Sequence, residues 1–134
     1  MKFVAIREHH LYNKAYRQGE RHVGKAVAVY ILRDYTAKRL MMAHPLKQYV
    51  NRIGLSVTKK IGGACVRTRA KRIIREAYRA VEREGSLKTG YLVVIAAREG
   101  IVDCKTQDVE RELRAAFKRL HFFANESKDP SKTS

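Results

Sequence analysis

The 134-residue sequence has no apolar run approaching the roughly 18 residues that a membrane-spanning helix needs. Its N-terminal run, Phe3 to Ile6, is only four residues long before Arg7 and is too short for the core of a signal peptide. Cysteine is equally scarce: Cys65 and Cys104 stand far apart and form no Cys-x-x-Cys pair. We therefore expect a cytoplasmic protein with two free thiols and no zinc site.

Acidic residues are few. The chain has 13 Asp and Glu against 29 Lys and Arg, which gives a net charge of +16 and a pI near 10.3. A balance this basic indicates a polyanionic partner, either nucleic acid or an anionic membrane surface. Because a membrane-binding chain needs an exposed apolar helix face or a long apolar run, we favour nucleic acid and expect no membrane association.

The residues of a protein active site are also missing. A nuclease that holds its own Mg²⁺ clusters its carboxylates, whereas the acids here are scattered and many have basic neighbours. His9 and His10 are adjacent and therefore point to different faces of a helix. The other histidines are isolated, and none is spaced for a triad with Cys65 or a serine. We predict no catalytic, cofactor-binding or metal site on this chain.

The hydrophobic pattern predicts one small α+β domain with the order α-β-β-β-α-β-α. We expect this domain to span residues 1–124 and a polar, disordered tail to span residues 125–134. The expected elements are a helix over 8–18, strands over 25–35, 40–43 and 52–58, a helix from the Gly62-Gly63 break to about residue 81, a strand over 91–97 and a helix over 106–121.

The run from Tyr91 to Ala97 is continuously apolar, which is typical of a strand covered on both faces. Its expected neighbour is the run from Ile53 to Val57, joined to it through the intervening helix as a βαβ unit. We expect a mixed sheet, in which this connection makes the two strands parallel.

The helix of this unit carries most of the charge. Its apolar positions, from Val66 to Val81, form one stripe that would face the core. Beside the stripe, Arg67, Lys71 and Arg75 follow one another at i, i+4 spacing, where like charges repel. A phosphate backbone would relieve the repulsion. The alternative is an ordinary solvated face of a basic protein.

Two tyrosines mark the first predicted helix. Tyr12 and Tyr16 lie four residues apart, at the edge of the face that Leu11 and Ala15 would turn to the core. They can be the rim of the core or a stacking platform for unpaired bases. The pattern alone leaves both interpretations open.

The segment KKIGGACVRTRAKRIIREAYR resembles the signature of the bacterial ribonuclease P protein component, which is Arg-Asn-Arg followed by a Lys-Arg pair. Arg67-Thr68-Arg69 stands in the first place and Lys71-Arg72 supplies the pair. Thr68 stands where the family signature has Asn, and Gly63 stands where the family often has Asn. The segments LYNKAYRQG, VAVYIL and GYLVVIAAR resemble further parts of the family in the same order, from Tyr12 to Leu120.

The resemblance implies a ribosomal protein S5 domain 2-like fold, whose βαβ crossover is left-handed where most are right-handed. It also implies an endoribonuclease holoenzyme, a ribonucleoprotein hydrolase in which the RNA subunit removes the 5′ leader of precursor tRNA. The Mg²⁺ would be bound mainly by that RNA, and no obligatory protein partner is inferred. The alternative is a structural RNA-binding protein, such as a ribosomal protein, because composition does not separate the two.

Two binding surfaces follow from the resemblance. The residues expected against the catalytic RNA are Arg67, Thr68, Arg69, Lys71, Arg72 and Arg75. Those expected to bind the single-stranded leader, in a cleft between the first helix and the sheet, are Tyr12, Tyr16, Arg52, Ser56, Lys59 and Lys60.

Overall fold

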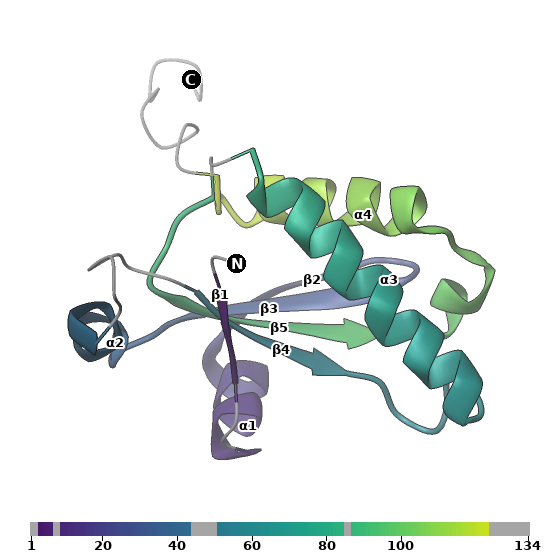
Figure 1. Cartoon of the computed structure of the whole chain (residues 1–134), viewed down its shortest axis with the longest axis horizontal. Coiled ribbons are helices and arrows are strands. Elements are labelled where there is room, and N and C mark those ends of the chain that lie inside the picture. Colours follow the sequence, from purple (N-terminus) through teal and green to yellow (C-terminus); the bar gives the residue numbers. More distant parts are fainter. Residues whose placement is uncertain (1–2, 7–8, 44–50, 85–86, 124–134) are drawn as a thin grey trace.

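The computed structural model describes residues 3–6, 9–43, 51–84 and 87–123, and these form a mixed sheet with helices on both faces (Figure 1). The five described strands lie in the order β1-β4-β5-β3-β2. Along the chain the elements are β1 (Phe3–Ala5), α1 (His9–Gln18), β2 (Glu20–Val23), β3 (Val27–Arg33), α2 (Ala37–Ala43), β4 (Asn51–Ser56), α3 (Ala64–Glu82), β5 (Tyr91–Ala97), the 3-10 helix η1 (Glu99–Asp103) and α4 (Thr106–Arg119).

The predicted βαβ unit is confirmed. β4 and β5 pair in parallel, and α3 makes the connection between them. β1 extends the parallel part on the other side of β4, whereas β3 and β2 complete the sheet with antiparallel pairs. In Figure 1, α3 and α4 lie together on one face of the sheet and α1 lies on the other. The handedness of the crossover stays a prediction.

The larger apolar cluster lies between the sheet and the pair α3 and α4. The predicted stripe of α3 is buried from Ala70 to Val81, and only Val66 at its start remains half-exposed. β5 is covered on both faces as expected: Val93 and Ile95 belong to this cluster, whereas Leu92 and Val94 pack under α1. The two clusters fix α3 and α1 on opposite sides of the same strands.

One predicted strand is wrong. Residues 40–43 belong to α2, and Ala, Leu and Met all favour helices. The prediction failed because a four-residue apolar run is too short for its periodicity to separate a strand from a helix. Two edge strands were also missed. β1 comes from the short apolar run at the N-terminus, and β2 is largely exposed, so that neither shows a strand's alternation. Residues 44–50 and the predicted tail lie outside the described residues.

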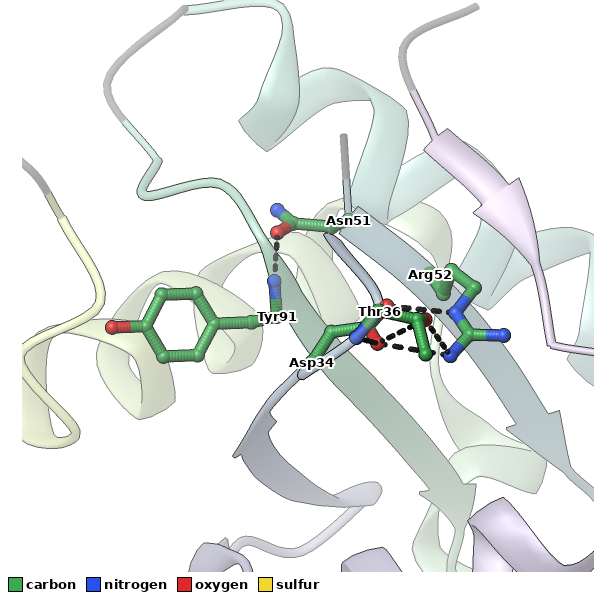
Figure 2. Close-up of polar contacts among 5 residues, drawn as sticks. All are labelled: Asp34, Thr36, Asn51, Arg52 and Tyr91. Atoms are coloured by element: carbon green, nitrogen blue, oxygen red, sulfur yellow. Dashed lines mark hydrogen bonds and ion pairs between the residues drawn. The ribbon is translucent and has the colours of Figure 1, made fainter. Parts of the chain in front are cut away.

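A cluster of polar side chains joins the ends of the three central strands (Figure 2). Arg52 at the start of β4 donates to both carboxylate oxygens of Asp34, over 2.7 and 2.9 Å, and to the hydroxyl of Thr36. Next to it, the Asn51 side chain accepts a hydrogen bond from the Tyr91 backbone N–H and donates one to the Lys88 carbonyl. Since β3, β4 and β5 are all held here, the cluster fixes their register.

The ion pair is buried, with 9% of the Arg52 side chain and 1% of the Asp34 side chain exposed. Burial by itself raises the pKa of Asp34, but hydrogen bonds from Arg52 and Thr36 outweigh it and hold the pKa below its ordinary value of 3.8. A carboxyl group whose pKa is lowered by folding stabilises the fold above its unfolded-state pKa. That contribution is lost as the pH falls through the lower, folded-state pKa.

We predict that Asp34→Asn lowers the free energy of unfolding by about 3–5 kcal/mol at neutral pH, because it removes the carboxylate charge that Asp34 holds against the buried Arg52 guanidinium. Urea unfolding at pH 7 and near pH 3 measures this, and the loss should shrink in acid, because the contribution of the pair decreases once the pH falls below the unfolded-state pKa of Asp34. Glu84→Gln is the control, since it removes an exposed partner of Arg114. Equal costs for the two substitutions would contradict a structural role for the buried pair.

Candidate nucleic-acid interface

α3 begins at a pair of glycines. Gly62 has a φ of +154°, and a Cβ there would lie 3.0 Å from the Cβ of Val66, so a side chain at this position would be strained. Gly63 is the N-cap residue and provides no side-chain cap, and its neighbourhood is open. The first turn holds no acidic residue. Its backbone N–H groups therefore add positive potential to the end of the helix that carries the signature.

The basic side chains of α3 form an exposed ridge. Lys71, Arg72 and Arg75 are exposed, and within the described part of the chain none of them has an ion-pair partner. Because each of these charges is solvated and unneutralised, the ridge can contact a polyanion without breaking an existing ion pair. It is the most concentrated basic surface that the sequence predicted.

The other three predicted residues of α3 differ among themselves. Thr68 is exposed and available for contact. Arg69 is also exposed but donates a 2.8 Å hydrogen bond to the Cys104 carbonyl, which ties α3 to the end of η1. Arg67 is half-buried, and its buried Nε has no hydrogen-bond partner among the described residues. An anion that reached this nitrogen would satisfy a buried donor.

Tyr12 and Tyr16 pack at the rim of the core and both keep exposed surface, whereas their role in stacking on bases stays a prediction. The ring of Tyr12 lies on the backbone of Gly54, where an added Cβ would lie 2.7 Å from the ring. Tyr16 packs edge-on against Tyr30, with ring centroids 4.9 Å apart. Both tyrosines pack against the smaller apolar cluster and remain partly exposed. Each ring is thus held in place by the sheet and still offers some surface to solvent.

The hydroxyl of Tyr12 stays protonated at neutral pH. Burial and the neighbouring Tyr16 raise its pKa above the ordinary value of 10.0, while a backbone hydrogen bond with Leu55 opposes the shift. A neutral phenol does not repel a phosphate as a phenolate would, so the ring is compatible with a polyanion.

A row of small residues crosses the sheet next to the two tyrosines. Ser56 on β4 is in register with Ala96 on β5, and Ala96 is in register with Ala28 on β3. These residues share a face with Gly54 and Tyr30, because alternate residues of a strand lie on the same side. Ser56 and Ala96 are half-exposed. The side chains on this face beside α1 therefore project little from the sheet. An extended single strand of nucleic acid could approach the tyrosines from this side.

Arg52, a predicted leader-binding residue, has its charged group in a buried ion pair. Its guanidinium is held in the buried pair with Asp34 (Figure 2), so its geometry favours a structural role. Lys59 and Lys60, in contrast, are exposed in the turn after β4, where Gly62 N–H bonds the Lys59 carbonyl. This turn lies between the end of the sheet face and the start of α3, and so connects the two predicted surfaces.

Two features of this region were not predicted. One is a cavity of ≈ 240 Å³ between β1, α1 and α3, which Tyr12, Lys71 and Arg75 help to line. The other is a wider hollow of ≈ 590 Å³ where Lys25, Lys60 and Arg98 meet, with Glu99 also on its wall. Both bring together residues far apart in the sequence, and no local pattern could have indicated them.

The described residues contain no group of three His, Cys, Asp or Glu side chains placed to hold a metal ion. Among the helices that are described, none is long and apolar enough to cross a bilayer. This part of the chain therefore offers side chains for binding a polyanion and no carboxylate cluster that fits Mg²⁺.

Comparison with known proteins gives a consistent result. The family model described as ribonuclease P matches residues 1–121. The chain is similar to ribonuclease P protein components from Clostridium acetobutylicum, at 32% identity over 119 residues covering 89% of this chain and 90% of that protein, and from Clostridioides difficile, at 32% identity over 108 residues covering 81% and 83%.

Solved structures show the same fold. The ribonuclease P protein of Staphylococcus aureus superimposes with a TM-score of 0.69 at 22% identity, covering 89% of this chain and 96% of that one. The Thermotoga maritima protein superimposes with a TM-score of 0.64 at 18% identity, covering 83% and 92%. The predicted α+β fold class is therefore confirmed.

Proposed function

This chain belongs to the ribonuclease P protein component family, and from that premise we propose that it is the protein subunit of a ribonuclease P holoenzyme. The holoenzyme is an endoribonuclease that removes the 5′ leader of precursor tRNA, and its catalysis lies with the RNA subunit. The observation that carries the proposal is the exposed basic ridge of α3, which bears the family signature and has no ion-pair partner for Lys71, Arg72 or Arg75 among the described residues.

The division of labour follows from the residues present. Phosphodiester hydrolysis assisted by Mg²⁺ needs oxygen ligands grouped around the metal, and the described residues do not group them. We propose that the metal ions are held mainly by the RNA subunit, with which the catalysis lies. The protein would act by charge, since its +16 offsets part of the repulsion among the catalytic RNA, the tRNA and the leader. Protein and Mg²⁺ would compete to neutralise the same phosphates, which lowers the Mg²⁺ requirement.

The two surfaces would divide the RNA partners between them. The ridge of α3, with Arg67, Thr68 and Arg69 at its start, would lie against the catalytic RNA. The leader of precursor tRNA would bind at the half-exposed rings of Tyr12 and Tyr16, next to the row of small residues that contains Ser56. Lys59 and Lys60 would contact the backbone where the two surfaces meet. Arg52 would support the leader surface through its pair with Asp34. We propose a cytoplasmic location for the protein, where its RNA partners would be.

We predict that this protein enables a bacterial ribonuclease P RNA to cleave precursor tRNA at the mature 5′ end at a Mg²⁺ concentration where the RNA alone is inactive. Gel analysis of the products with RNA alone, protein alone and both together measures this. Cleavage by protein alone would place catalytic groups on this chain. Binding without any stimulation of cleavage would favour a structural RNA-binding protein.

We predict that Lys71→Ala combined with Arg72→Ala weakens binding to the catalytic RNA and flattens its salt dependence. The slope of log affinity against log salt should become shallower by about 1–2, because each lost phosphate contact removes roughly one released counterion. The matched control is Lys118→Ala combined with Arg119→Ala, which removes the same charge from exposed positions of α4. Equal slopes for the two double variants would show that α3 does not contact phosphate.

We also predict that Tyr12→Ala and Tyr16→Ala each weaken binding of precursor tRNA to the holoenzyme by about 5- to 150-fold and leave mature tRNA unaffected. Stacking of one base on an aromatic ring accounts for a loss of about 1–3 kcal/mol. Tyr→Phe at the same positions should restore binding, since it keeps the ring. Tyr35→Ala removes an exposed tyrosine that is not among the predicted leader-binding residues and is the control. Equal losses for both tRNAs would leave the tyrosines with a packing role alone.

A further inference from the structure

A cavity lies between α1 and α3, beside the end of β1, which is shorter than its neighbour β4. β1 ends at Ala5, and the Ile6 N–H that follows donates a hydrogen bond to the Ile53 carbonyl, over 3.0 Å. β4 continues to Ser56, and among the described residues no strand pairs with it on that side beyond Ile53. The cavity of ≈ 240 Å³ lies here, beside Leu55.

The walls of the cavity combine apolar and cationic groups. Ile6, Ile53 and Leu55 provide apolar surface, whereas Lys71 and Arg75 enter from α3. None of its described lining residues is acidic, and neither cation has an ion-pair partner in the described part of the chain. The favoured occupant is therefore a molecule with a flat apolar part and a negative charge.

One strand edge and one phenol offer polar groups to an occupant. In the parallel ladder the backbone groups of Leu55 point to the same side as those of Ile53, whose carbonyl is already bonded to the Ile6 N–H. Leu55 lies beyond the last register pair of β1 with β4, and the hydroxyl-bearing ring of Tyr12 also lines the cavity. Drug-sized ligands occupy pockets of about 300–1,000 Å³, so this smaller space has room for about one base.

We propose that this cavity receives a single unpaired nucleotide of RNA, with its base between Ile6, Leu55 and Tyr12 and its phosphate between Lys71 and Arg75. The inference rests on the proposed function, because the nucleotide would come either from the catalytic RNA bound along α3 or from the leader bound beside Tyr12. In both cases α3 would contact a base as well as phosphates. This contact would help hold the two RNAs at the junction of the two surfaces.

The test is a substitution that fills the cavity and leaves the charges in place. Ala5 lines the cavity but is itself exposed, so Ala5→Phe can be accommodated without repacking the core. Val23→Phe is the matched control, because it adds the same ring at an exposed position of β2, on the opposite edge of the sheet. Affinities for the catalytic RNA alone and for precursor tRNA in the holoenzyme are measured over a range of salt concentrations.

We expect Ala5→Phe to weaken binding of one of the two RNAs at least about tenfold, the size of one lost base contact, and to make its salt slope shallower by no more than about 1, because only one phosphate is displaced. The RNA that is affected identifies the source of the nucleotide. Unchanged binding of both RNAs by a folded Ala5→Phe protein would overturn the proposal. That outcome differs from failure of the proposed function, in which the parent protein itself does not support cleavage.

A second measurement keeps the proposal testable if Ala5→Phe does not fold. The parent protein is titrated with adenosine monophosphate, with uridine monophosphate and with inorganic phosphate, and the amide signals of Ile6 and Leu55 are followed by NMR. Saturable shifts at both amides with a nucleotide, at concentrations where inorganic phosphate moves neither, support the site. Identical responses to nucleotide and phosphate, or no response, would mean that no base is bound.

Discussion

The parallel pairing of β4 with β5 is the constraint on which the rest of the structure depends. Two parallel neighbours cannot be joined by a tight turn, so the chain must cross the sheet between them, and α3 makes that crossing. Its apolar stripe is buried on the sheet and against α4. The basic side chains beside the stripe are therefore left on the outside. One pairing thus both buries the core face of α3 and presents its charges to solvent.

Buried polar contacts hold this arrangement at two ends of the sheet. Asn51 and the Arg52–Asp34 pair fix the start of β4 against β3 and β5. At the other end, Glu112 of α4 accepts hydrogen bonds from the backbone N–H groups of Ala26 and Val27, over 2.8 and 2.9 Å. Each contact satisfies groups that would otherwise be costly to bury. Register is thereby fixed where a one-residue slip would turn the small residues under α1 to the wrong face.

The distribution of charge has a cost that a partner would offset. Cations at i, i+4 spacing on α3 repel one another, and no acidic residue at helical contact distance neutralises Lys71. In a protein optimised for stability alone, acidic residues would be interspersed there. Holding the ridge next to the Tyr12 surface, with the turn of Lys59 and Lys60 between them, places two RNA-binding surfaces within one small domain.

The sequence by itself determined the elements whose pattern is local. α3, β5 and α4 were predicted almost to their ends, because a helix stripe and a continuous apolar run can be recognised without knowing their partners. The ridge of Lys71, Arg72 and Arg75 followed from the same periodicity. Tertiary structure decided what depends on a distant partner, which made β1 and β2 edge strands. α2 was missed for a local reason, since so short an apolar run does not separate a helix from a strand.

The same reason explains the site. The sequence indicated Arg52 as a cation near the leader surface, but only the approach of Asp34 from the end of β3 shows that its charge is already paired. Tyr12 was recognised as an aromatic residue on a helix edge, but its position depends on Gly54 of strand β4, which leaves room for the ring. The cavity beside Leu55 brings together residues that are far apart in the sequence. A sequence states which side chains are available, and long-range packing decides which of them remain free to bind.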